Sequence, residues 1–200
     1  MKELKIYCDA GSFNNFKDSD KPTFGSYGTI LVQNNKIIKE WSDWYEDVSN
    51  NQMEVYGAIK GILEFLKRYK SNEKYKIEII SDSQYLVHGM NAWLSNWKKK
   101  NWINSSGKPV KNVELWKIID KLVNLKPTVE FIFTWQKGHC GKSITLEENP
   151  NIYFNEYVDS LATDKLKYAS GKDNMCICPE NEFQQIIVED LLYRLKINGD

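Results

Sequence analysis

The order of β-rich and helical segments is the feature that most limits how this chain can fold. Three β-rich segments come first, at residues 4–9, 25–32 and 36–44, and the last two are separated by Gln33-Asn34-Asn35, whose asparagines tolerate a positive φ angle. Helical and β-rich segments then alternate, and a strand–helix–strand order requires a parallel crossover. We therefore expect an α/β fold with a five-stranded mixed sheet, three antiparallel strands followed by two parallel ones, flanked by helices.

The first predicted helix has one apolar face and two interior glycines. Apolar residues recur at helical spacing from Val55 to Leu66, after Ser49, which can cap a helix. Gly57 and Gly61 each cost about 1 kcal/mol relative to Ala inside a helix, so we expect this helix to approach the sheet closely. Further helices are expected at residues 83–97, 113–125, 153–168 and 183–195.

The charges balance overall but are unevenly distributed. Lys plus Arg and Asp plus Glu each number 27, so any surface for a polyanion must be a local patch. Residues 98–111 contain five lysines and no acid, whereas the chain from Asp173 onward contains six acids against Arg194 and Lys196. The basic stretch is therefore the candidate contact for a polyanion.

The cysteines and the apolar segments indicate the cellular compartment of the protein. Four cysteines without a secretory leader indicate free thiols in a reducing cytoplasm, and the apolar runs are far shorter than the roughly 20 residues that span a bilayer. Cys176 and Cys178 would supply only half of a tetrahedral metal site. We expect a cytoplasmic monomer with no membrane contact and no obligate protein partner.

Four acids lie where predicted elements begin or end. Asp9 lies at the end of the first strand, which the turn-forming residues 10–12 close, and Asp82 follows the strand at 76–81. Glu54 lies in the first turn of the first helix and Asp159 in the helix at 153–168. Taken singly, each acid could be a cap, a turn former or part of a solvated face. Such ends converge on one crevice in an open sheet, and clustered carboxylates require hard cations such as Mg²⁺ or Mn²⁺.

The sequence motifs around these acids are more specific than the acids themselves. Five motifs occur in order, Tyr-Cys-Asp-Ala-Gly-Ser at 7–12, Asn-Asn-Gln-Met-Glu at 50–54, Ser-Asp-Ser-Gln-Tyr at 81–85, Trp-Gln-Lys-Gly-His at 135–139 and Asn-Glu-Tyr-Val-Asp-Ser-Leu-Ala at 155–162. Over about residues 5–166 the chain resembles the type 1 ribonucleases H of bacteria. The resemblance implies a ribonuclease H-like fold.

The resemblance also implies an activity and a cofactor. The family hydrolyses the RNA strand of RNA/DNA hybrids with two Mg²⁺ ions, for which Mn²⁺ can substitute, and leaves 5′-phosphate and 3′-hydroxyl ends. By direct match, the metal ligands would be Asp9, Glu54, Asp82 and Asp159. His139 matches the family's mobile histidine, which assists proton transfer, and an imidazole suits that work. His88 lacks this context and is interpreted as structural or exposed.

Substrate contacts are expected at two places. Asn51 and Gln84, with Asn15 as a looser match, fall where the family reads 2′-hydroxyls across the minor groove. Residues 98–112 resemble the family's basic protrusion, whose lysines neutralise phosphates of the DNA strand. The candidates there are Trp93, Lys98, Lys99, Lys100, Trp102 and Lys111. Turn chemistry for Asn15, a solvated charge run and Trp rings that form the core of the protrusion remain alternatives.

The resemblance ends before the chain does. We expect a catalytic domain at residues 1–168 and a helical C-terminal extension at 169–200 that has no counterpart in the family. Ala10 displaces the family's glycine, and the loops at 13–23 and 140–154 are longer than usual. Two other classes stay open, a binding module without chemistry and a DNA-cutting relative such as a transposase or junction resolvase.

Overall fold

The computed structural model describes residues 1–13, 23–70, 72–138 and 144–170. Its five-stranded sheet has the order β3-β2-β1-β4-β5. β1 pairs antiparallel with β2, which pairs antiparallel with β3, whereas the β1–β4 and β4–β5 pairs are parallel. This arrangement confirms the predicted mixed sheet. The strands are β1 (Lys2–Phe13), β2 (Phe24–Gln33), β3 (Lys36–Glu46), β4 (Tyr75–Ser81) and β5 (Val129–Trp135).

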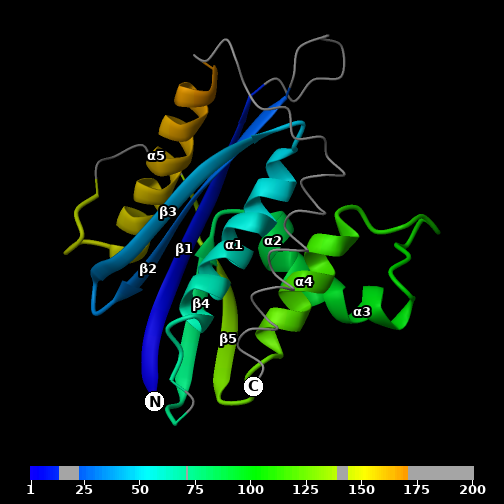
Figure 1. Ribbon diagram of the computed structural model, residues 1–200, viewed down its shortest axis with the longest axis horizontal. Helices are drawn as coiled ribbons and strands as arrows, with labels where there is room; N and C mark the ends of the chain where they lie inside the picture. The colour runs from blue at the N-terminus through cyan, green and yellow to red at the C-terminus, as the bar shows by residue number, and fades with distance from the viewer. Residues whose placement is uncertain (14–22, 71, 139–143, 171–200) are drawn as a thin grey trace.

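Helices cover both faces of the sheet. α5 (Pro150–Ser170) lies on one face, and α1 (Asn50–Leu66), α2 (Gln84–His88) and α4 (Val113–Val123) lie on the other (Figure 1). The single helix predicted at 83–97 is wrong in one respect, because a π-helical turn, Gly89–Trp93, separates α2 from α3 (Leu94–Lys99). Among the described helices, none has the length and apolar character needed to cross a bilayer. The helix predicted at 183–195 lies outside the described residues.

The start of α1 is fixed by a capping box. The Ser49 hydroxyl accepts a hydrogen bond from the Gln52 amide, and the Gln52 side chain accepts one from the Ser49 amide at 2.6 Å. These two bonds satisfy amides that have no partner inside the helix. Because the helix begins at Asn50, Glu54 lies one turn later than predicted and outside the first turn.

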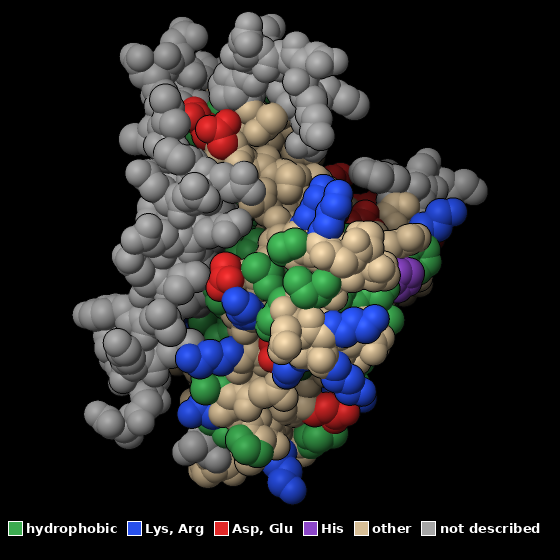
Figure 2. Space-filling model, turned by 90° about the vertical axis from the view of Figure 1, so that its right-hand side faces the viewer, with side chains coloured by type: hydrophobic (Ala, Val, Ile, Leu, Met, Phe, Trp, Pro, Cys, Tyr) green, Lys and Arg blue, Asp and Glu red, His purple; other side chains and the backbone are tan. Residues whose placement is uncertain are grey.

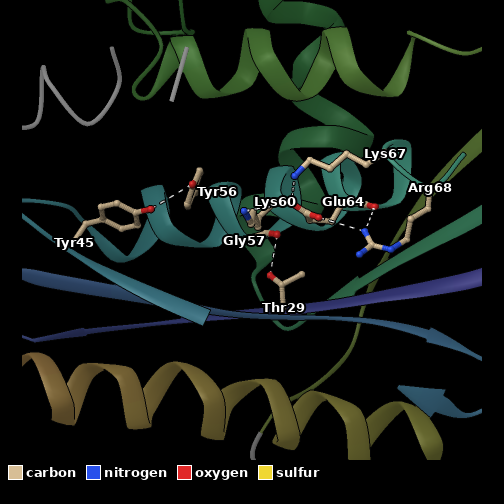
Figure 3. Close-up of polar contacts among 8 residues, drawn as sticks. All are labelled: Thr29, Tyr45, Tyr56, Gly57, Lys60, Glu64, Lys67 and Arg68. Carbon is tan, nitrogen blue, oxygen red and sulfur yellow. Dashed lines mark hydrogen bonds and ion pairs between the residues drawn. The ribbon is translucent and has the colours of Figure 1, made fainter. Parts of the chain in front are cut away.

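The interior glycines of α1 allow it to lie directly on the sheet, as predicted. A Cβ atom on Gly61 would lie 2.5 Å from Cγ2 of Ile6, which is a clash. Thr29 on β2 donates a hydrogen bond to the carbonyl oxygen of Gly57 at 2.9 Å (Figure 3). The end of α1 is held by Glu64, which pairs with Lys60, Lys67 and Arg68 (Figure 3). Residues on α1 are therefore placed rigidly relative to β1 and β2.

β1 extends further than its sequence pattern indicates. The prediction that residues 10–12 close the strand after Asp9 is wrong, because β1 stays paired with β2 as far as Phe13. The parallel pairing of β1 with β4 ends earlier, at Tyr7 and Ile80. Asp9 therefore lies just beyond the point where β1 and β4 separate. Such a point, at the carboxyl end of a parallel strand, is where α/β sheets form their crevices.

An aromatic cluster holds the segment that follows β4. Trp116 on α4 is fully buried, and a Cβ atom on Gly89 would lie 2.1 Å from its ring, so only glycine fits there. The Trp116 indole donates to the Tyr85 hydroxyl at 3.1 Å, and the Trp97 ring packs 5.3 Å from the Trp116 ring. This cluster connects α2, α3 and α4, and with them the protrusion at residues 98–112.

Candidate active site

Asp9 is the most buried of the four predicted acids. Only 6% of the Asp9 residue is exposed to solvent. Burial, followed by the negative charge of Asp82, raises the pKa of Asp9 well above its usual range, and the charge of Asp159 adds to the effect. The structure therefore brings both Asp82 and Asp159 within electrostatic reach of Asp9.

Glu54 reaches the same region from α1. Its carboxylate accepts a hydrogen bond from the Ser83 hydroxyl, which directly follows Asp82, and another from the Asn50 amide group at 2.9 Å. Burial raises the pKa of Glu54 to about 7, and the charge of Asp82 also raises it, although both hydrogen bonds act in the opposite direction. The Ser83 contact thus holds Glu54 close to the end of β4, while Asn50 binds it from within α1.

Asp82 follows the last residue of β4 and is enclosed by the end of β5. The Trp135 indole donates a hydrogen bond to the Asp82 carbonyl oxygen at 3.0 Å. A Cβ atom on Gly138 would lie 2.1 Å from Oδ2 of Asp82. The segment after β5 can therefore pass the Asp82 carboxylate only because residue 138 has no side chain.

Asp159 is brought to Asp9 by the close approach of α5 to β2. Asp9 is directly opposite Gly28 in the β1–β2 pair. A Cβ atom on Gly28 would lie 2.3 Å from the carbonyl oxygen of Val158. Only a glycine at this position allows the helix turn that carries Asp159 to lie beside Asp9.

The four acids lack a positive partner among the residues that the structure describes. In the described part of the chain, none of these carboxylates takes part in an ion pair. Nor do the described residues contain three or more His, Cys, Asp or Glu side chains grouped closely enough to hold one metal ion. Mg²⁺ is usually bound by one or two carboxylates, with waters and substrate phosphates completing the shell. The oxygen donors and the uncompensated charge therefore fit Mg²⁺ bound by pairs of carboxylates.

Of the residues predicted to contact 2′-hydroxyls, the structure describes two. Asn51 and Gln84 are exposed at the starts of α1 and α2, three residues before Glu54 and two after Asp82. They are thus close in sequence to two of the acids and open to solvent. Asn15 and His139 lie outside the described residues.

The predicted protrusion residues are mostly exposed. Trp93 is 38% exposed, whereas Trp102 is partly buried with a φ angle of 64°. Lys98 forms an ion pair with Asp120 at 2.7 Å. Lys99, Lys100 and Lys111 are exposed, and in the described part of the chain none of them forms an ion pair.

Three residues that shape the site were not predicted. Ser83 and Asn50 fix the Glu54 carboxylate, and Gly138 makes room for Asp82. Asn50 could have been found, because it lies four residues before Glu54 and such positions meet on one helix face. Ser83 and Gly138 act across large sequence distances, which no local pattern reveals.

The strand order and the carboxylates at the β1–β4 opening define a domain of the ribonuclease H fold class. The ribonuclease H family model matches residues 1–167. Ribonuclease H of Pseudoalteromonas translucida (strain TAC 125) is 39% identical over 172 residues, which cover 86% of this chain and 93% of the relative. The chain belongs to the ribonuclease H family and is a hydrolase.

Solved structures agree with this fold. The PFV RNase H domain has a TM-score of 0.61 at 21% identity, and the match covers 84% of this chain and 96% of that domain. LC11-RNase H1, solved in complex with an RNA/DNA hybrid, has a TM-score of 0.53 at 16% identity, covering 84% of this chain and 99% of that protein. At these identities the likeness concerns the fold alone.

Proposed function

We propose that this enzyme is an endonuclease that hydrolyses the RNA strand of RNA/DNA hybrids with two Mg²⁺ ions bound by Asp9, Glu54, Asp82 and Asp159. The observation that carries the proposal is the set of mutually repelling, half-buried carboxylates with no cationic partner among the described residues. Carboxylates held together in this way require cations to stay ionised at neutral pH. Mn²⁺ is the expected substitute, because it also prefers oxygen ligands.

Each acid contributes from a different element. Asp9 comes from β1, Asp82 directly follows β4, Glu54 comes from α1 and Asp159 from α5. Two divalent cations, when bound, would activate a water and stabilise the leaving oxygen of a phosphodiester. The cleavage then leaves 5′-phosphate and 3′-hydroxyl ends. His139 would carry a proton during the reaction, as its imidazole is suited to do near neutral pH.

Recognition of the hybrid is proposed to use two surfaces. Asn51 and Gln84, with Asn15, would contact 2′-hydroxyls of the RNA strand, which distinguish RNA from DNA. The protrusion would contact the DNA strand through lysines and through the exposed Trp93 ring. LC11-RNase H1, which shares the fold, was solved with such a hybrid. We propose that the enzyme acts as a monomer in the reducing cytoplasm, where the buried Cys8 stays a free thiol.

Cleavage assays on three labelled substrates test the proposal. A hybrid, a DNA duplex and an RNA duplex of the same sequence are incubated with the enzyme, with Mg²⁺ or with a chelator. We expect cleavage of the hybrid only, confined to its RNA strand and dependent on Mg²⁺. Cleavage of the DNA duplex would favour a DNA-cutting relative. Binding of the hybrid without cleavage would favour a module that has lost its chemistry.

A further inference from the structure

The protrusion contains an open cavity with apolar walls. Its volume is about 470 Å³, and it lies between α3 and the residues that follow this helix. Trp93 and Ile103 on its walls are 38% and 37% exposed. Apolar side chains that are left open to solvent next to one another commonly mark a surface that another segment or molecule covers. The lining residues include Trp93, Trp97 and Ile103, with Asn96, Lys100 and Asn104.

The surroundings of this cavity are strongly basic. Lys99, Lys100, Lys108 and Lys111 are all exposed, and within the described residues none of them pairs with a carboxylate. On the face shown in Figure 2, Lys and Arg side chains are interspersed with hydrophobic ones. A segment that is both apolar and acidic would complement this surface.

The chain itself contains such a segment, at residues 173–200, outside the described residues. It has six acids against two basic residues, the reverse of the charge of the protrusion. Between Phe183 and Leu195 apolar residues recur at helical spacing; Glu189 and Asp190 lie among them, and Glu182 directly precedes them. The match to the ribonuclease H family model ends at residue 167, before this segment begins.

The connection to this segment is long enough. Twelve residues separate the end of α5 at Ser170 from Phe183. An extended chain spans about 3.3 to 3.6 Å per residue, which gives roughly 40 Å. A domain of this size has a diameter of about 40 Å, as its expected radius of gyration is near 15 Å. A tethered segment also acts at an effective concentration of order millimolar, which favours even a weak contact.

We propose that residues 173–200 dock on the protrusion of their own chain and compete there with nucleic acid. The apolar side of the 183–195 segment occupies the cavity beside Trp93 and Trp97, and its acids face the free lysines. The docking is an autoinhibitory contact that weakens binding of the hybrid at low salt. The competition rests on the proposed function, whereas the docking itself does not.

Lysine reactivity in the full chain tests the docking without any substrate. The test variant carries Glu180→Gln, Glu182→Gln, Glu189→Gln and Asp190→Asn. The control carries the same change of charge at exposed acids elsewhere, Glu3→Gln, Glu130→Gln, Glu147→Gln and Asp43→Asn. Acetylation of Lys99, Lys100 and Lys108 is followed by mass spectrometry over time. We expect acetylation to be at least threefold faster in the test variant than in wild type, and unchanged in the control.

Further variants and a dilution series test whether the chain's own tail or a second copy of the protein occupies the cavity. Ile187→Ser with Leu191→Ser removes apolar side chains and should also expose the lysines. Equal acetylation rates in wild type and in both tail variants would overturn the docking. Protection that disappears on dilution of the protein would assign the contact to a second copy and would also overturn it. The KM for the hybrid should fall in the test variant while kcat stays unchanged. Altered acetylation in an enzyme that cleaves no hybrid would uphold the docking and refute the proposed function.

Discussion

The Asp82 carboxylate lies directly against the backbone of Gly138, so that a Cβ atom at residue 138 would be 2.1 Å from its Oδ2 atom. We expect Gly138→Ala to turn the carboxylate away and to lower kcat/KM by roughly 10- to 100-fold, because small displacements of catalytic groups have effects of this size. Steady-state kinetics at saturating Mg²⁺ checks the loss. Urea unfolding serves as the control, since the change should leave global stability nearly constant. Full activity in this variant would mean that the position of Asp82 is not critical.

Asp9→Asn should abolish hydrolysis while leaving hybrid binding intact, because it removes a metal ligand and no phosphate contact. The same change should raise the thermal stability of the metal-free protein, since it removes a buried carboxyl group that must either carry a charge repelled by Asp82 or take up a proton on folding. Differential scanning calorimetry in a chelator measures the second effect. Asp43→Asn, at an exposed position on β3, is the matched control and should alter neither property. Substantial activity of Asp9→Asn in Mg²⁺ would contradict the assigned role.

The metal-free protein should lose stability as the pH rises from about 4 to about 7. Burial in the folded state raises the pKa of Glu54 to about 7. The value in an unfolded chain is near 4.3. The folded state therefore binds more protons in this window, and the free energy of unfolding falls with increasing pH. Thermal melts in a chelator measure this slope, which Glu54→Gln should flatten. Mg²⁺ should restore stability at pH 7, and a melt indifferent to both pH and Mg²⁺ would count against a carboxylate site.

His139→Ala should slow turnover by roughly 10- to 100-fold, a modest general acid–base contribution. The effect should appear in kcat and should alter the pH–rate profile near neutral pH. His88→Ala is the control, because His88 is an exposed residue beside the Trp93 ring. Identical profiles for His139→Ala and the wild-type enzyme would make His139 a bystander.

Replacing Lys99 and Lys100 by Ala should raise the KM for the hybrid and flatten its dependence on salt. Each phosphate that the enzyme no longer neutralises lowers the slope of log affinity against log salt by about 0.9. The turnover number should change much less, since these lysines are separate from the four acids. Lys36→Ala with Lys39→Ala removes the same charge from exposed positions on β3. An equal effect of both pairs would show that only net charge matters.

The sheet was predictable because its local signals agree with its tertiary contacts. Asn34 and Asn35 do adopt φ angles of 51° and 56°, as the hairpin between β2 and β3 requires. The glycines of α1 likewise gave the correct expectation of a close approach to the sheet, where the structure places Ile6 and Thr29 against them. In these cases the same residue satisfies a local preference and a packing requirement, so the sequence alone reveals it.

The errors arose where distant residues decide the structure. The π-helical turn at Gly89 accompanies the packing of Trp116, which lies 27 residues later in the sequence. β1 continues to Phe13 because β2 pairs with it, although its sequence pattern ends near Asp9. Of the candidate site, the four acids could be named in advance. The Ser83 contact with Glu54 could not, because it joins residues 29 positions apart.

β1 and β4 separate beyond Tyr7, and Asp9 lies in the opening between them. The register of β1 against β2 therefore decides which side chain enters the site. Cys8 is fully buried on the side of α1, where its Cβ faces Gly57, while the neighbouring Asp9 is influenced by Asp159 on α5. A slip of one residue would exchange the two sides of the strand. It would replace the carboxylate by a thiol, a soft ligand poorly suited to Mg²⁺. A protein with a misaligned hairpin would therefore be inactive. Recovery of enzymatic activity during refolding consequently reports correct strand alignment.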